Sequence, residues 1–336
     1  MCYKLQGSTK NALCGVSPLS NRKVFLSYHQ PSFLYGTDTM QLNATDMDRI
    51  EVKYRKVLKC MLSVPDCTTS AVVYFSAGVL PASAQRDVEI LGLLGQLGGL
   101  CENEAQSIRN VIEHTLSFYD VSFKGWSSLV RKACLKYGLP DPLAYLKYPW
   151  RPDRWRDHCK KVVIDYWETE LLQVVKTSDT LKYVDTEYLS LATPMRVWQM
   201  AGLNSISVRQ ATVQHWMLVG VYYTRAFLFK MKKISSALCL GCKTENEDLN
   251  HLILHCTFFA TIRDNYLPKY LLQNNRLSDI LGNEDQIIQT ILDPLSEHIS
   301  ENIRNNWNSV KTVYEISRQF CYDLHRKREK LYSVVV

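Results

Sequence analysis

The sequence predicts a mostly α-helical protein: a helical bundle, a helical connector, a small Cys/His knuckle and a long C-terminal helix. Three observations predict this fold class. Apolar residues recur at helical spacing in several long segments. Prolines and glycines interrupt these segments where helices would end. One short segment combines three cysteines and a histidine at the spacing C-x2-C-x8-H-x4-C. Apolar residues make up 46% and charged residues 22%, as in ordinary globular proteins.

The first strong helical pattern follows Thr45, which can cap a helix with Asp48 at the capping-box position. Pro65 is expected to end it. Basic side chains occupy most of its remaining faces, either as a solvated surface or as a surface that contacts phosphates. These are Arg49, Lys53, Arg55, Lys56 and Lys59. A second helix is expected to open at Leu80-Pro81. Its end is predicted at the glycines Gly95, Gly98 and Gly99.

Residues 139–153 are too proline-rich for any regular element, so we place a module boundary there. Helices are then predicted from Trp155 to about Val175, from about Ser207 to Phe229, and from Ile299 to Leu324. On the second of these, His215 is interpreted as a hydrogen-bonded core histidine rather than a ligand. The predicted segments are 1–65, 66–138, a linker at 139–153, 154–234, 235–262 and 263–336.

The cysteine-histidine segment predicts a structural zinc site. Cys239 and Cys242 flank a tight turn, in which Gly241 allows the backbone to bend sharply. His251 and Cys256 on the next short helix can complete a tetrahedron around Zn²⁺. Four protein ligands leave no position for water, so one structural ion is expected rather than a catalytic one.

The fourth ligand is open between two neighbouring residues. On a regular helix His251 and His255 share a face, and Cys256 is rotated away from it. A helix that frays at Cys256 would restore the reach of its thiol. We therefore prefer Cys256 as the ligand and place His255 beside the ligand set or facing solvent.

Charge and cysteine usage limit the partners and the compartment. The net charge of +7 favours a polyanionic partner. The N-terminus lacks the apolar run of a signal peptide, and no stretch is apolar and long enough for a membrane span. The eleven cysteines form no regular disulfide framework. Reduced thiols in the nucleus or the cytoplasm are therefore expected, without membrane association.

A basic segment with interleaved aromatic residues runs from Arg131 to Lys161. It carries nine basic residues against three acidic ones. Cations neutralise phosphates and rings stack on bases, so this composition suits a single strand; a solvated rim around buried rings is the alternative. With the basic residues from Arg225 to Lys243, the segment is predicted to form one groove for single-stranded RNA, with DNA possible. The candidate residues are Lys147, Trp150, Arg151, Arg154, Trp155, Arg156, Lys160, Lys161, Arg225, Lys230, Lys232, Lys233 and Lys243.

No catalytic motif is found in the sequence. It contains no P-loop, no G-x-S-x-G and no His-Glu-x-x-His. Tyr183-Val184-Asp185-Thr186 resembles half of a two-metal polymerase site, but it lacks a second aspartate and is interpreted as a loop. We therefore expect no enzymatic activity, no small-molecule substrate and no primer extension.

Short blocks spread along the chain form a recognisable series: Val24–Tyr28, Phe33–Gly36, Tyr54–Leu58, Leu62–Pro65, Gly78–Pro81, Trp155–Trp167, Ala211–Val213, Leu218–Tyr222, Cys239–Cys256, Ile291–Pro294 and Cys321–His325. In this order they resemble the C-terminal portion of a non-LTR (LINE-type) retrotransposon reverse transcriptase. The resemblance covers nearly the whole chain, and the order of the blocks together with the knuckle makes it specific.

The resemblance implies a thumb-like helical bundle followed by the connector, the CCHC zinc knuckle and the helical tail. Such parts grip template or target nucleic acid. The family's fingers and palm would lie before residue 1, and its polymerase aspartates and endonuclease have no counterpart in this sequence. Lys243 also stands where the family usually has a small or polar residue. The expected function is a non-catalytic, nucleic-acid-binding remnant. The alternatives are a zinc-stapled protein-interaction scaffold, or a decaying or truncated copy with no independent role.

Overall fold

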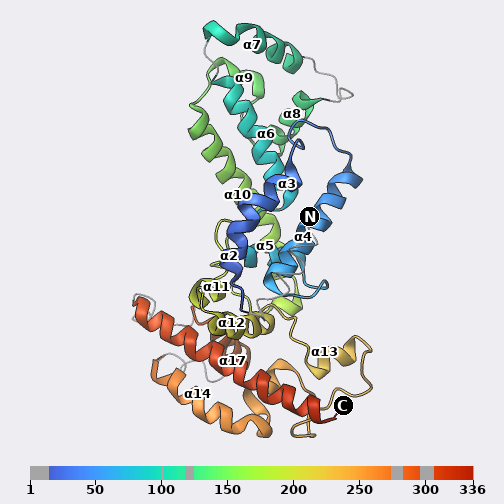
Figure 1. Ribbon diagram of the computed structural model, residues 1–336, viewed down its shortest axis with the longest axis vertical. Helices are drawn as coiled ribbons and strands as arrows, with labels where there is room; N and C mark the ends of the chain where they lie inside the picture. The colour runs from blue at the N-terminus through green and yellow to red at the C-terminus, as the bar shows by residue number, and fades with distance from the viewer. Residues whose placement is uncertain (1–14, 100–101, 118–124, 274–282, 296–305, 336) are drawn as a thin grey trace.

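The computed structural model describes residues 15–99, 102–117, 125–273, 283–295 and 306–335. Over these ranges the protein is an elongated stack of helices (Figure 1). A single isolated bridge between Leu238 and Asn246 is the only β-pairing in the described ranges. The predicted helical fold class, including a Cys/His cluster, is thus confirmed.

The N-terminal half forms the upper part of the molecule in Figure 1. Within it, α10 packs along α6, α4 packs on α5, and α8 lies against α6. Its elements are α2 (Pro18–Val24), η1 (Phe25–His29), α3 (Gln30–Leu34), α4 (Ala44–Leu62), α5 (Ser70–Ala77), α6 (Ala82–Gly98), α7 (Glu102–Ser117), α8 (Trp126–Tyr137), α9 (Pro142–Lys147) and α10 (Pro152–Lys176).

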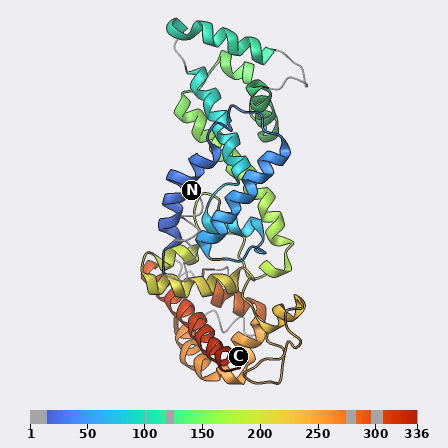
Figure 2. The same cartoon turned by 45° about the vertical axis from the view of Figure 1, so that its right-hand side comes forward.

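The C-terminal half forms the lower part and is organised around α17 (Figures 1 and 2). This long helix packs against both α12 and α14. The elements are η2 (Asp179–Leu181), α11 (Arg196–Ala201), α12 (Ser205–Leu218), α13 (Arg225–Lys230), η3 (His251–His255), η4 (Thr257–Phe259), α14 (Ala260–Gln273), α15 (Glu284–Leu292) and α17 (Trp307–Val335). The predicted long C-terminal helix is present, although Ile299 and Ile303 lie outside the described residues.

Hydrogen bonds from side chains of α12 join the two halves. His215 on α12 is buried, and its Nε2 lies 2.9 Å from the hydroxyl of Ser76 on α5. The neighbouring Trp216 donates its indole N–H to the Ser63 carbonyl at 2.8 Å. Burial lowers the pKa of His215 to about 3, so the ring is neutral at physiological pH. The prediction that His215 is a hydrogen-bonded core histidine is therefore confirmed.

The first predicted helix begins two residues earlier than the sequence indicated. Asn43, not Thr45, is the N-cap: its side-chain oxygen accepts the backbone N–H of Asp46 at 2.7 Å. Asparagine and threonine are both good caps, so spacing alone did not decide between them. The helix ends at Leu62, and its C-cap Ser63 adopts a left-handed conformation (φ 53°) before Pro65.

Of the three glycines predicted to close α6, Gly98 and Gly99 do so, because the helix continues to Gly98 and is capped by Gly99; Gly95 lies inside the helix. Gly95 instead allows a close helix contact. A Cβ atom at this position would collide with the indole ring of Trp155 on α10. Trp155 is fully buried there and donates its indole N–H to the Leu91 carbonyl at 2.8 Å.

Residues 139–153 contain a regular element after all, so the expectation of an irregular linker is wrong. Asp141 caps the short helix α9, and its carboxylate accepts the backbone N–H of Leu143 at 2.9 Å. Pro142 occupies the first helical turn, where a missing N–H costs nothing. Prolines at both ends of α9 therefore delimit the helix rather than prevent it.

The predicted helix from Ser207 to Phe229 is divided in two. It ends at Leu218, and α13 begins only after the Thr224 cap. Gly220 between them has φ of 67°, and a Cβ there would collide with the Thr180 carbonyl. The apolar run was continuous, so only this backbone contact reveals the break.

Candidate metal centre

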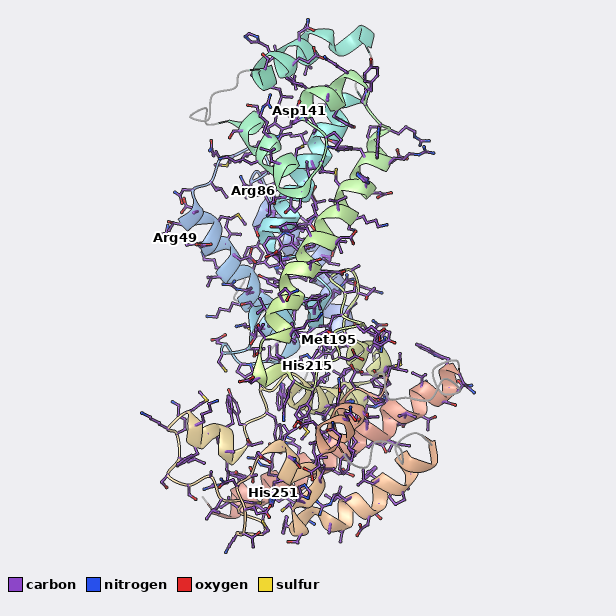
Figure 3. All side chains as sticks on the ribbon, turned by 180° about the vertical axis from the view of Figure 1, so that it is seen from behind. Arg49, Arg86, Asp141, Met195, His215 and His251 are labelled. Carbon is purple, nitrogen blue, oxygen red and sulfur yellow. The ribbon has the colours of Figure 1, made fainter. Side chains whose placement is uncertain are left out.

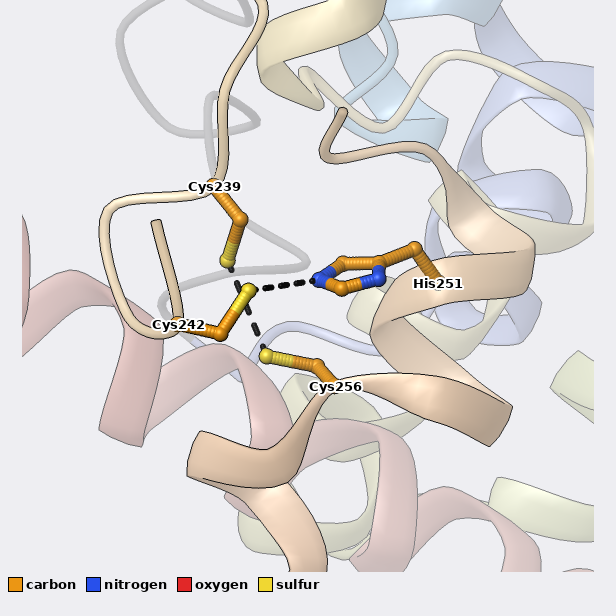
Figure 4. Close-up of side chains that lie close together, drawn as sticks. All are labelled: Cys239, Cys242, His251 and Cys256. Carbon is orange, nitrogen blue, oxygen red and sulfur yellow. Dashed lines mark hydrogen bonds between the residues drawn. The ribbon is translucent and has the colours of Figure 1, made fainter. Parts of the chain in front are cut away.

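The first two cysteines are placed by a small hairpin-like loop. The Cys239 N–H donates to the Glu245 carbonyl at 2.8 Å, and the Lys243 N–H donates to the Cys239 carbonyl at 2.9 Å. These bonds fold the loop so that the sulfur atoms of Cys239 and Cys242 point toward the same space (Figure 4). The expected tight turn between two thiols is therefore present.

Gly241 has a different role from the one that the sequence indicated. Its φ is not in the left-handed region; in this loop that conformation belongs to Lys243, with φ of 61°. Gly241 is needed for space, because a Cβ there would lie 2.8 Å from the Cβ and Cγ of Phe258. Phe258 follows the last cysteine, so this contact packs the loop against the second half of the site.

The second half of the site is a single wide helical turn. Residues His251–His255 form a π-helix, closed by a 2.7 Å bond from the Cys256 N–H to the His251 carbonyl. A π-turn joins residues five apart, whereas a regular α-turn would rotate Cys256 away from His251. The neighbouring His255 is 46% exposed and lies 3.1 Å from Glu284. This geometry supports Cys256, not His255, in the cluster.

The four side chains converge on one point (Figure 4). The three sulfurs and the His251 nitrogen all lie within 4.8 Å of one another, so the group could hold a metal ion. Cys239 and Cys256 are 3.7 Å apart at sulfur, and Cys242 Sγ is 3.3 Å from His251 Nε2. Tetrahedral Zn–S bonds of about 2.3 Å imply a sulfur–sulfur separation of about 3.8 Å. The observed spacing therefore fits tetrahedral coordination.

The orientation of the histidine is fixed by a carboxylate outside the cluster. His251 Nδ1 lies 2.8 Å from Glu245 Oε2, which directs Nε2 toward the cysteines. The backbone N–H of His251 donates to Asp248 at 2.7 Å. Metal-bound histidines are commonly held in this way, because the carboxylate sets the tautomer and raises the basicity of the ring.

The buried environment disfavours the thiolate form of two of the three cysteines. Burial raises the pKa of Cys239 to about 12 and also raises that of Cys256. Burial opposes ionisation of Cys242 too, but hydrogen bonds from Thr244 and the Glu245 backbone outweigh it and lower the pKa to about 6. A divalent metal would supply the charge that lets three neighbouring thiolates coexist.

An ion pair that the sequence did not reveal attaches the knuckle to α17. Glu247 and Arg328 are both buried, and the guanidinium Nε and Nη2 donate to one carboxylate oxygen at 2.9 and 2.6 Å. The same oxygen accepts the backbone N–H of Arg225 at the start of α13 at 3.0 Å. The two residues are 81 positions apart in the sequence, so no local sequence pattern predicts that they pair, and only the fold shows it.

The predicted nucleic-acid residues near α10 are mostly on the surface. Trp150 is 48% exposed, and the predicted cations beside it are exposed as well: Lys147, Arg151, Arg154, Arg156, Lys160 and Lys161. Trp155 is the exception and a wrong prediction. It is buried between α6 and α10, so its ring has no face for a base to stack on.

The prediction of a single groove is also wrong. The start of α10 lies near the upper end of the molecule, whereas α13 and the knuckle lie in the lower part (Figures 1 and 2). Figure 3 places Asp141 and His251 near opposite ends. The 25 residues of α10 alone span about 37 Å. Arg225, Lys230, Lys232, Lys233 and Lys243 therefore belong to a separate surface.

Comparisons with known proteins add no relative. The sequence matches no protein-family model, and searches of curated proteins and of solved structures found no match. Within the described ranges, no helix has both the length and the apolarity needed to cross a membrane. The function is therefore argued from the geometry of this chain.

Replacing Lys243 by glycine is expected to stabilise the knuckle by about 1 kcal/mol, because an L-residue in the left-handed region is strained by about 1–2 kcal/mol and glycine is not. Urea unfolding of the metal-loaded protein measures the effect. Lys233 is exposed and has no positive φ, so Lys233→Gly is the matched control and should not stabilise. Equal behaviour of the two variants would contradict the strain argument.

Proposed function

We propose that the cluster holds one structural Zn²⁺. Three thiolates and one imidazole are soft and borderline donors, and tetrahedral S₃N sets are typical of structural zinc. The four side chains would close the coordination sphere, so no position remains for water or substrate. The convergence of these four donors is the observation that carries the proposal.

We propose further that the zinc-stapled chain is a non-catalytic, nucleic-acid-binding module related to the C-terminal portion of a non-LTR reverse transcriptase. Single-stranded RNA is the favoured partner, DNA is possible, and the compartment is the nucleus or the cytoplasm. Exposed cations and rings gather where α9 meets α10. This α10 cluster consists of Lys147, Tyr148, Trp150, Arg151, Arg154, Arg156, Lys160 and Lys161.

Trp150 offers the α10 cluster a fixed stacking surface. Its ring meets buried Trp155 edge to face, with centroids 5.9 Å apart and planes at 87°. The ring centroid of His158, which lies on α10 like Trp155, is 5.1 Å from that of Trp150. A ring held by a buried neighbour loses little conformational freedom when a base stacks on it. Trp155 thus supports the proposed site from beneath rather than contacting nucleic acid.

Acidic neighbours do not exclude phosphate from the α10 cluster. Arg151 pairs with Asp153 at 2.9 Å, and Arg156 lies 3.6 Å from Glu89. All four side chains are exposed by more than a third. Exposed pairs of this kind are worth about 0–1 kcal/mol, so a phosphate can displace the carboxylates.

Charge reversal at Arg151, Arg154 and Arg156 together tests this function. Binding of a labelled single-stranded RNA should weaken with salt, with a log–log slope of about −0.7 for each phosphate contact. The triple variant should flatten the slope by about two units. Trp150→Ala should weaken binding by about 1–3 kcal/mol at unchanged slope, because stacking releases no counterions.

A protein-interaction scaffold is the competing proposal, in which the cations are only a solvated rim. It predicts neither the change in slope nor the loss on removing Trp150. An unchanged slope in the triple variant, with its zinc content and melting intact, would favour the scaffold.

A further inference from the structure

A cavity lies between the two halves of the molecule, away from the α10 cluster. Its volume is about 1100 Å³, and three segments line it: the C-terminal end of α4, the connection from α12 to α13, and the last turns of α17. This is slightly above the range of about 300–1,000 Å³ that is usual for pockets that hold small ligands. Residues from the end of α4 and from the last turns of α17 face each other across it.

Aromatic side chains form much of the cavity wall. Trp216 is held by its bond to Ser63, and the Tyr222 hydroxyl lies 3.1 Å from His325 Nδ1. Tyr223 lies beside them and is 43% exposed, with Phe227 5.8 Å away between ring centroids. The wall therefore combines fixed rings with one ring that a ligand can reach.

Cationic side chains outnumber acidic ones in the lining of the cavity. Lys59, Arg326 and Lys330 line the cavity, against the two acids Asp66 and Glu329. The basic face of α4 leads toward the cavity, because Arg55 and Lys56 are one turn before Lys59. Leu228 of α13 also lines the cavity, and the basic residues Lys230, Lys232 and Lys233 follow it.

We infer that this cavity binds an unpaired segment of a single-stranded nucleic acid, with a base against Tyr223 and phosphates on the cationic rim. The inference rests on the proposed function and adds a second site to it. Rings with a mainly cationic rim suit bases joined by phosphates, since every base has a stacking face and every linkage a negative charge. An acidic peptide would use the cations but not the ring.

The test uses the full zinc-loaded chain and a fluorescein-labelled octauridylate. Tyr223→Ala should weaken binding about 5- to 150-fold, as expected for the loss of one stacked base. Tyr223→Phe keeps the ring and should bind like the parent. Tyr35→Ala is the matched control, because Tyr35 is 91% exposed and does not line the cavity. Lys59→Glu with Arg326→Glu should reduce the salt slope by about 1.4, or two contacts.

The outcomes separate this inference from the proposed function. If the α10 triple variant loses binding while the cavity variants bind normally, the inference is overturned and the proposed function stands. If both sets bind normally, both are overturned. Equal losses in Tyr223→Phe and Tyr223→Ala, or competition by polyglutamate as strong as by unlabelled octauridylate, would also overturn the inference. Zinc content and melting temperature verify that each variant is folded.

Discussion

Replacing Cys239 by serine is expected to release the metal and unfold residues from about Ser235 to Ile262. Cys239 is buried, and its sulfur is 3.7 Å from that of Cys256. Without the Cys239 thiol, the other three side chains would lose the cation that we propose they share. Binding free energy at a structural site is folding free energy, so the loss should be several kcal/mol.

Elemental analysis and urea unfolding measure this result. The parent protein should carry one zinc per chain, and Cys239→Ser should carry none. Cys67 is exposed and outside the cluster, so Cys67→Ser is the control and should keep both zinc and stability. Freshly purified parent protein without zinc would refute the proposed site.

Replacing Arg328 by methionine is expected to cost about 3–5 kcal/mol of unfolding free energy. In the parent, Arg328 Nη2 donates to the Glu247 carboxylate at 2.6 Å. The substitution removes this donor and leaves the carboxylate buried without its partner. It also removes the donor to the Tyr223 carbonyl at 2.7 Å. The contact between α17 and the knuckle should therefore loosen first, which urea unfolding and amide exchange can follow.

Arg326 on the same helix provides the control for this prediction. It is exposed, so Arg326→Met should change stability by no more than about 0.5 kcal/mol. Adding Glu247→Leu to Arg328→Met should recover part of the loss, because no buried charge then remains. A parent-like unfolding midpoint for Arg328→Met alone would contradict the assigned role of the pair.

Local spacing predicted much of this protein. The helices α4, α10 and α17 follow from apolar periodicity, because the faces of one helix are set by its own sequence. The metal cluster follows from the spacing of four donors within 18 residues. Boundaries were less secure: Asn43 replaced Thr45 as a cap, and Gly220 divided one predicted helix. Which of two possible residues caps a helix, and where a close backbone contact divides it, depend on the neighbouring segments.

The sequence by itself determined the helical class, the segment that holds the Cys/His cluster and which segments are basic, whereas the choice between His255 and Cys256 was left open. The tertiary structure alone decided which side chains meet. It buried Trp155 against Gly95, separated the α10 cluster from α13, and joined Glu247 to Arg328. The physical reason is that ligand spacing and helix faces are properties of a few consecutive residues. Burial and the approach of side chains depend instead on how segments far apart in the chain pack together.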